Sequence, residues 1–425
     1  MNNLKVLMFG WEFPPYYSGG LGTACYGLTK GLSNNHIDVT FVMPQGPEDI
    51  SSSHVKLIVA SNLKRYSIKI KKFNTLLKPY LSEEEYSQEY QRYIESRKGN
   101  TKPLYGKDIY EEVYRLALTA KLIALSDDYD IIHCHDWMTF PAGIEAKKAT
   151  GKPLIVHIHA TEFDRTGGNG VNQYVYDVER EGMHAADRVI AISEFVKRNI
   201  IKNYGVPESK ISLVHNGIDY YIPQRFNIRK NEKVVLFLGR LTLQKGPDYF
   251  IEAAKKVLDF DPDVKFIIFG TGDMEHKLVQ RVAELGIGNN VLFGGFVTGS
   301  EVDKAFQLAD LFVMPSVSEP FGLTPLEALR NNVPVIISKQ SGVSEVLKNA
   351  LKVDFWDIDE LANKIISVLN YRALHHELRH HGSLEVQTFN WNVPAQKCIS
   401  IYNQLVNQAL SQTLNQRPFI RPIGV

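Results

Sequence analysis

The sequence is poor in cysteine and has no long apolar run. Its 425 residues include only Cys25, Cys134 and Cys398, which stand far apart without a CxxC pair. This spacing excludes a disulfide framework and favours a reducing compartment. No apolar run approaches the ~18 residues of a membrane-spanning helix, and the opening "MNNLKVLMFG" lacks a signal-peptide cleavage site. We therefore expect a cytoplasmic protein without a transmembrane segment.

An excess of charge is also missing. Lysine and arginine number 48 and aspartate and glutamate 47, a net charge of +1 that gives no general attraction to nucleic acid. A basic stretch at 64–72 could touch an anionic membrane, but the acidic residues that follow balance it and favour a solvated surface. An apolar content of 44% is typical of a globular protein, and the length allows two separate cores.

Short apolar runs alternate with helical patterns in two series. The runs are KVLMFG, DVTFVMP, VKLIVA, DIIHCH, PLIVHIHA, RVIAIS and ISLVHNG, then KVVLFLG, VKFIIFG, NVLFGG, LFVMPS and PVIIS. Such runs predict an α/β protein with two doubly wound parallel sheets, each covered on both faces. We expect domains at 1–214 and 215–394, with a helical insertion at about 62–115. A last helix, at about 395–425, is expected to pack back on the first domain.

A glycine-rich loop follows the first predicted strand. In "WEFPPYYSGGLGTACYGL", Gly20, Leu21 and Gly22 precede a helix that we expect to start near Thr23. Free N–H groups at a helix start favour a phosphate. The loop matches neither GxGxxG nor a P-loop. The alternative is a glycine turn needed only for chain geometry.

Histidines end two predicted strands. His133 and His135 in "IIHCHDWM" share a face of their strand, as metal ligands could, and Asp136 follows. We find no third ligand with zinc spacing and expect no metal site. His157 and His159 end the next strand, where the polar residues of "ATEFDRTGG" suggest hydrogen bonding to a substrate. A lone histidine there would more often be structural.

The second half places cations just after a strand. In "FLGRLTLQKG", Arg240 and Lys245 could hold a diphosphate. Arg240 would donate two parallel hydrogen bonds, and Lys245 would act as a point charge. Gly270 and Gly272 end the next strand, where the backbone could approach a donor closely. Each glycine could instead only form the turn between two elements.

Two carboxylates lie eight positions apart in "SEPFGLTPLEAL". Glu319 could bond sugar hydroxyls and Glu327 a ribose diol, while Phe321, Gly322 and Leu323 would offer backbone N–H groups at a helix start. The alternative is a helix-terminal charge at Glu319 and a surface residue at Glu327. The apolar setting of Glu327 argues against that alternative, because an unpartnered buried carboxylate is costly.

These motifs together resemble the retaining glycosyltransferases of the GT-B fold, in the family 4 group that borders the glycogen and starch synthases. The resemblance rests on EPFGLTPLEA, GRLTLQKG, HNGID and EFPPYYSGGLG, and HCHDWMT is similar to a glycogen synthase segment. It runs to about residue 395 and is weak at 62–115 and in the last thirty residues.

The resemblance implies two Rossmann-like domains that face each other across a cleft. The second domain would hold a nucleotide-diphosphate-sugar, such as UDP-glucose or ADP-glucose, and the first a carbohydrate acceptor. Arg240 and Lys245 would neutralise the departing diphosphate, Glu319 would contact the donor sugar and Glu327 the ribose. The glycine loop at 20–22 would close on the phosphates.

The resemblance also assigns His159 to the sugar and Asp136 to the surroundings of the reacting centre, although His157 stands where relatives often have threonine. The family is thought to transfer on the front face without a metal, so we expect no metal and no other cofactor. The DxD within 259–263 then reads as a turn, and the histidines of "HHELRHH" at 375–381 as a solvated surface.

The sequence also allows other acceptors and has to be compared with other enzymes of the same fold. The acceptor could be an α-glucan or a precursor of surface polysaccharide or glycoconjugate. A nucleotide-sugar epimerase would need an acid/base set, and a phosphorylase a cofactor-binding lysine in a longer chain; neither is evident. The intact set of Arg240, Lys245, Glu319 and Glu327 argues against a non-catalytic sugar-nucleotide binder.

Overall fold

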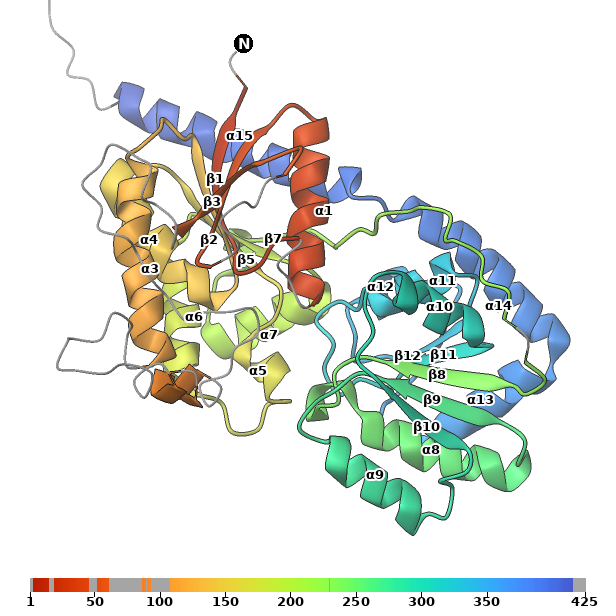
Figure 1. Cartoon of the computed structure of the whole chain (residues 1–425). Coiled ribbons are helices and arrows are strands. Elements are labelled where there is room, and N and C mark those ends of the chain that lie inside the picture. Colours follow the sequence, from red (N-terminus) through yellow and green to blue (C-terminus); the bar gives the residue numbers. More distant parts are fainter. Residues whose placement is uncertain are drawn as a thin grey trace, which may run out of the picture.

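The chain forms two α/β lobes, which lie side by side in the computed structural model (Figure 1). The structure describes residues 3–14, 19–45, 52–60, 86–88, 90–92, 108–228 and 230–415. Most of the insertion expected at 62–115 therefore lies outside the described residues. We call the half with β1–β7 the first lobe and the half with β8–β13 the second lobe.

The first lobe is built on a parallel seven-stranded sheet with the order β3-β2-β1-β4-β5-β6-β7. Its strands are β1 (Lys5–Phe9), β2 (Asp38–Met43), β3 (Lys56–Val59), β4 (Ile131–His135), β5 (Leu154–Ile158), β6 (Arg188–Ala191) and β7 (Ile211–Leu213). In β1, Leu7 and Phe9 join one buried cluster, whereas Val6 and Met8 join another. Both faces of the sheet are thus buried, and this is why its strands read as continuous apolar runs.

Helices cover both faces of the first sheet. They are α1 (Gly20–Asn34), α3 (Ile109–Ala124), α4 (Phe140–Thr150), α5 (Glu162–Arg165), α6 (Gln173–Ala185) and α7 (Glu194–Tyr204), with 3-10 turns at Trp137–Thr139 and Glu208–Lys210. Helix α1 begins at Gly20, three residues before the expected start near Thr23. The prediction was wrong because it counted the glycines as a loop, whereas two of them form the first turn of the helix.

The second lobe has a parallel six-stranded sheet with the order β10-β9-β8-β11-β12-β13. Its strands are β8 (Val234–Leu238), β9 (Lys265–Phe269), β10 (Val291–Gly295), β11 (Leu311–Met314), β12 (Val335–Ser338) and β13 (Leu351–Val353). The predicted fold class, two parallel sheets flanked by helices, is confirmed. The sequence did not predict β13, because three residues with a lysine in the middle carry no apolar run.

Helices flank the second sheet in the same manner. They are α8 (Pro247–Phe260), α9 (Glu275–Glu284), α10 (Ser300–Leu308), α11 (Thr324–Arg330), α12 (Val343–Val346), α13 (Ile358–Asn370) and α14 (Arg372–Glu385), with 3-10 turns at Leu243–Lys245 and Val386–Thr388. The DxD motif lies where α8 ends and before β9 begins, as a turn would. His376 and His380 are exposed on α14, as expected.

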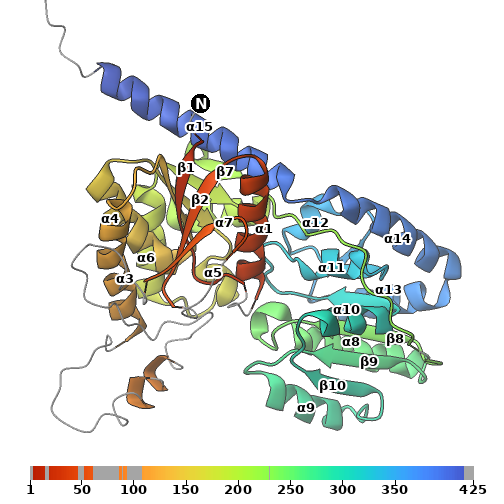
Figure 2. The same ribbon diagram turned by 45° about the horizontal axis from the view of Figure 1, so that its top comes forward.

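The last helix, α15 (Asn392–Asn415), runs from the second lobe back across the first, beside α1 (Figures 1 and 2). Trp391, Cys398 and Tyr402 are buried in the same cluster as β1 and α1. The chain crosses between the lobes a first time near Ile218, and there the Ile218 N–H donates to the Phe389 carbonyl at 2.9 Å. The two crossings therefore lie next to each other, while the domain boundary at 214/215 stays a prediction.

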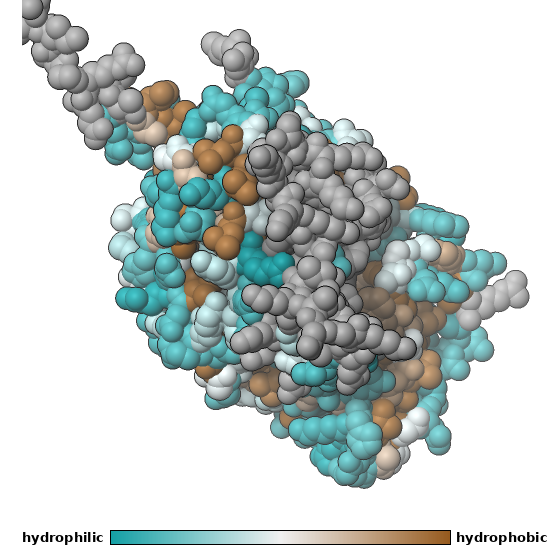
Figure 3. Space-filling view, turned by 60° about the vertical axis from the view of Figure 1, so that its left-hand side comes forward, coloured by the Kyte–Doolittle hydropathy of each residue, from teal (hydrophilic) through white to brown (hydrophobic). Residues whose placement is uncertain are grey.

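Among the residues that the structure describes, no helix combines the length and the apolar character needed to cross a bilayer. The described part of the face in Figure 3 is largely hydrophilic, with apolar side chains scattered between polar ones.

Candidate active site

The carboxyl edges of the two sheets meet between the lobes. Ser193, just after β6, donates its Oγ–H to the Pro320 carbonyl at 2.6 Å. Ser318, in the loop after β11, donates to Asp164 Oδ1 of the first lobe at 2.9 Å. In open parallel sheets ligands bind beyond the carboxyl ends of the strands. This meeting place is therefore the natural position for a site.

Lys245 and Glu319 are in direct contact there. Lys245 Nζ lies 2.5 Å from Glu319 Oε2, and Ser316 Oγ donates to the same oxygen at 3.4 Å. Glu319 is only 6% exposed, and both residues line a small cavity with Gly239 and Thr324. The fold thus brings together two predicted site residues that are 74 positions apart.

Arg240 lies at the end of β8 and is exposed. Its Nη2 donates to Gln244 Oε1 at 3.2 Å, and the Gln244 carbonyl accepts the Val317 N–H at 3.0 Å. The loop after β8 is thereby connected to the loop after β11. That Arg240 binds a phosphate stays a prediction.

Gly270 lets two strand ends pack closely. Its φ is 136°, and a Cβ would lie 1.8 Å from the Gly239 carbonyl oxygen; a Cβ on Gly272 would lie 2.3 Å from that of Leu241. Both glycines therefore approach the segment that carries Arg240. Their approach to a donor stays a prediction.

Glu327 lies on α11 and is half-buried. Burial raises the pKa of its carboxyl group, and the nearby Arg330 opposes this effect. Phe321 is buried and Gly322 has a φ of 101°, a conformation that favours glycine. Leu323 precedes the helix as its N-cap. Their contact with a donor stays a prediction.

The predicted phosphate loop contains a carboxylate that sequence reasoning missed. Glu12 is fully buried, and its Oε1 accepts the Gly22 N–H at 2.6 Å. Its negative charge lies near the start of α1, where the helix dipole is positive. A phosphate at Gly20, Leu21 and Gly22 would have to share this helix start with Glu12.

Asp136 and His159 lie together at the ends of β4 and β5. Asp136 has a φ of 59°, and its Oδ1 accepts the N–H groups of His159 at 2.7 Å and Ala160 at 3.3 Å. Burial raises the pKa of Asp136 to about 7, although Arg165 opposes this effect. Burial lowers the pKa of His159 to about 3, so its imidazole is neutral at physiological pH.

The histidines form a closer group than the sequence predicted. His157 on β5 lies within reach of His133 and His135 on β4, and these three residues have the arrangement of metal ligands. The sequence did not predict that a third histidine lies beside this pair. His157 comes from the neighbouring strand, so sequence spacing within one motif could not reveal its position.

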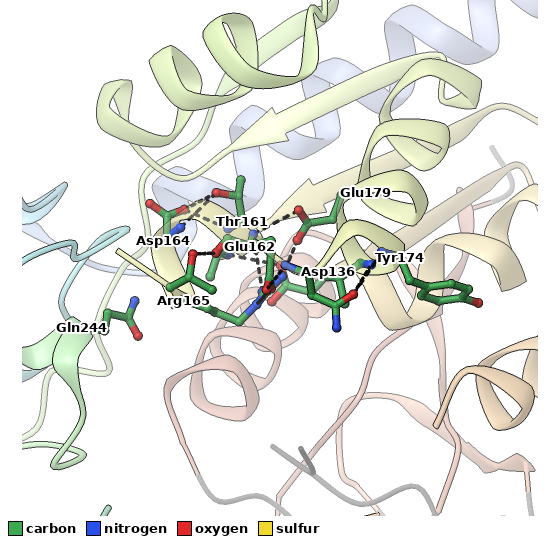
Figure 4. Close-up of polar contacts among 12 residues, drawn as sticks. Asp136, Thr161, Glu162, Asp164, Arg165, Tyr174, Glu179 and Gln244 are labelled. Carbon is green, nitrogen blue, oxygen red and sulfur yellow. Dashed lines mark hydrogen bonds and ion pairs between the residues drawn. The ribbon is translucent and has the colours of Figure 1, made fainter. Parts of the chain in front are cut away.

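A buried network of charges borders Asp136 (Figure 4). Arg165 donates to Glu162 at 3.1 Å, to the Ala160 carbonyl at 3.0 Å and to Glu179. These polar residues, suggested for substrate binding, thus bond one another. Glu179 belongs to α6, outside "ATEFDRTGG", and nothing in that motif predicted its part in the network.

Asp164 extends this network to the second lobe. It forms a capping box with Thr161 at the start of α5, a pattern readable from "TEFD". It also accepts from Asn199 at 3.0 Å, in addition to Ser318. Gln244 lies on the facing side of the site, across from Arg165 (Figure 4).

Two family models match consecutive parts of the chain. The model described as Glycosyltransferase Family 4 matches residues 18–220, and that described as Glycosyl transferases group 1 matches residues 221–383. The chain is 29% identical over 419 residues to an uncharacterized glycosyltransferase of Methanocaldococcus jannaschii, covering 94% of this chain and 98% of that protein. It is 24% identical to the glycogen synthase of Mycobacterium tuberculosis, covering 94% of each.

Solved structures support the same fold. Sucrose-phosphate synthase from Thermosynechococcus elongatus superposes with a TM-score of 0.73 at 20% identity, covering 96% of this chain and all of that one. HepE from Anabaena, solved in complex with UDP and glucose, has a TM-score of 0.69 at 19% identity, covering 95% of this chain and all of that one. At such identities the likeness concerns the fold alone.

Proposed function

Because the chain belongs to the glycogen synthase-like glycosyltransferases of family 4, which have the GT-B fold, we propose that it transfers a hexose from a nucleotide-diphosphate-sugar to a carbohydrate acceptor with retention of configuration. The observation that carries the proposal is the 2.5 Å contact between Lys245 and Glu319 in the cavity at the carboxyl edge of the second sheet. A cation beside a carboxylate matches a ligand that joins a phosphate to a sugar.

In this proposal the donor separates the Lys245–Glu319 pair. The diphosphate forms an ion pair with Lys245, and Arg240 is a second cation beside it. Glu319 accepts hydrogen bonds from the sugar hydroxyls. Glu327 would accept those of the ribose. Fixed cations stabilise the charge that develops on the leaving group, and in a site closed to water this effect is large.

The transfer step is proposed to occur on one face of the sugar. The bond from the anomeric carbon to the phosphate oxygen breaks, the acceptor oxygen bonds to the same face, and the acceptor proton passes to the departing phosphate. No protein nucleophile and no metal ion take part. His159 would position the sugar, and Asp136, which holds the His159 backbone at 2.7 Å, would keep that strand end in place.

We propose glucose as the sugar, carried by UDP or ADP, and an α-glucan as the acceptor. The support is the full-length similarity to a glycogen synthase and the fold shared with a protein that binds UDP and glucose. A panel of donors and acceptors would test this choice, with release of UDP or ADP as the readout and product analysis for the anomer.

The phosphate assignment is tested with Lys245→Ala and Arg240→Ala. Loss of one preorganised donor in such a site typically costs 10²–10³-fold in kcat, so we expect at least ~100-fold slower transfer from each variant in a folded protein. Lys256→Ala, an exposed lysine of α8, is the matched control. A chelator should leave the initial rate unchanged, and full activity of either variant would refute the assignment.

A further inference from the structure

Four histidines form an ordered array between the first sheet and α15. His133 and His135 come from β4, and His157 and His159 from the paired β5, where His135 lies opposite His157. The first three are at most 2% exposed. Their side chains lie on the sheet face that α15 covers, because His133 bonds Tyr402 of that helix.

The rings are arranged as two hydrogen-bonded pairs. His133 Nε2 lies 3.2 Å from His157 Nδ1, and His135 Nδ1 lies 2.9 Å from His159 Nε2. The pairs stack, with 4.5 Å between the ring centroids of His133 and His135. Four imidazoles thus share one buried space.

Two nitrogens of this array have no hydrogen-bond partner among the described residues. They are Nε2 of His135 and Nε2 of His157, and both are buried. A buried polar atom without a partner is costly, and native structures rarely contain one without a reason. His135 Nε2 can serve as a metal ligand once its ring proton is on Nδ1, and His157 Nε2 can carry the ring proton while Nδ1 serves as the ligand.

We propose that His133, His135 and His157 bind one transition-metal ion, for which Zn²⁺ is the reference. Their candidate ligand atoms lie within 4.8 Å of one another. Tetrahedral zinc, with bonds of about 2.0–2.1 Å, needs ligand nitrogens about 3.3 Å apart. His133 Nε2 and His157 Nδ1 lie 3.2 Å apart, so with these two atoms as ligands the ion replaces their hydrogen bond and the His157 ring proton is on Nε2. Rotation of the His135 ring brings in its Nε2 as the third ligand. Neutral imidazoles are good ligands for zinc and its neighbours.

The surroundings complete the site. The Tyr402 hydroxyl, 2.7 Å from His133 Nδ1, fixes the orientation of that ring, as outer partners of metal-bound histidines do. Because the ligands are enclosed and Tyr402 belongs to α15, the ion is structural: it ties the C-terminal helix to the first sheet and takes no part in transfer.

The test uses the full-length protein in metal-free buffer. Titration with Zn²⁺, followed by elemental analysis, should give one tightly bound equivalent and a higher Tm, and Co²⁺ should give the visible bands of a tetrahedral site. His135→Ala and His157→Ala should each lose that equivalent. The double variant His376→Ala/His380→Ala, which removes an exposed pair one helical turn apart, should keep it.

A variant that preserves all three ligands guards against misfolding of the alanine variants. Tyr402→Phe should weaken zinc binding 10–100-fold while the protein stays folded. The proposal is overturned if the wild type binds no stoichiometric Zn²⁺ or Co²⁺, or if the bound equivalent disappears only in the His376/His380 variant. None of these readouts depends on transfer, so their failure leaves the proposed function standing.

Discussion

Protonation of a single carboxyl group should control donor affinity. Burial raises the pKa of Glu327, and only its ionised form can accept two ribose hydroxyls. The raised pKa means that the protonated form appears at a higher pH than for an ordinary glutamate. We therefore expect the KM for the donor to rise as the pH falls from neutral into the mildly acidic range.

Initial-rate kinetics across this pH range check the expectation. Glu327→Gln should have a higher KM at neutral pH, and that KM should hardly change with pH. Glu284→Gln, at a half-exposed position on α9, should behave as the wild type. A wild-type KM that is flat from neutral to mildly acidic pH would contradict the ribose assignment.

The backbone at Gly270 supports the loop that carries Arg240. In Gly270→Ala the new Cβ would collide with the Gly239 carbonyl in a backbone conformation that alanine avoids, so we expect a loss of more than ~1 kcal/mol of stability. Transfer should fall as well, because Arg240 follows Gly239. Chemical denaturation and rate measurements test both effects. Gly288→Ala, where a Cβ meets nothing within 4 Å, is the control and should change neither.

Among the elements, α15 contributes to the stability of the first lobe, in part through Trp391, which directly precedes it. The Trp391 ring lies so close to α1 that a Cβ on Gly27 would be 2.0 Å from it. Trp391 is 6% exposed, and replacing a buried tryptophan by alanine typically costs about 3–5 kcal/mol. We expect Trp391→Ala to lower the free energy of unfolding by this amount in a urea titration.

Trp356 provides a matched control, since it is 58% exposed in the second lobe. Trp356→Ala should change stability by no more than ~0.5 kcal/mol. Equal stability losses in the two variants would show that α15 does not need Trp391 to dock.

The sequence predicted elements where their signal is local. Twelve strands were readable as apolar runs, because both faces of each sheet are buried, whereas β13 has only three residues and one of them is Lys352. Lys245 and Glu319 were predicted because each follows a strand at a carboxyl edge. The sequence did not predict Glu12, Glu179 or the position of His157 beside the other histidines. Their partners are brought close only by the fold.

At the scale of the whole molecule, several polar contacts join the two lobes. They include Ser193 with Pro320, the Glu345 carboxylate with the N–H groups of Glu194 and Phe195, and Ser318 with Asp164. Ser318→Ala deletes the hydroxyl that donates to Asp164, a bond of about 0.5–1.5 kcal/mol. We expect the variant to populate a more open arrangement and small-angle scattering to report a larger radius of gyration. Ser383→Ala, whose hydroxyl bonds only within α14, should match the wild type.

A double-mutant cycle with Asp164→Ala tests whether Ser318 acts on the arrangement of the lobes through its contact with Asp164. If the two side chains act as one contact, the double variant should be no more open than the single ones. Additive opening would mean that Ser318 and Asp164 act on the arrangement of the lobes through separate contacts.

The return of α15 to the first lobe also bears on how the protein is made. A ribosome releases the second lobe's strands, up to Val353, before it releases Trp391 and Tyr402. Until then the nascent chain exposes the apolar face of β1 and α1 that these residues cover. The half synthesised first is thus completed last, which gives chaperones a defined surface to guard during translation.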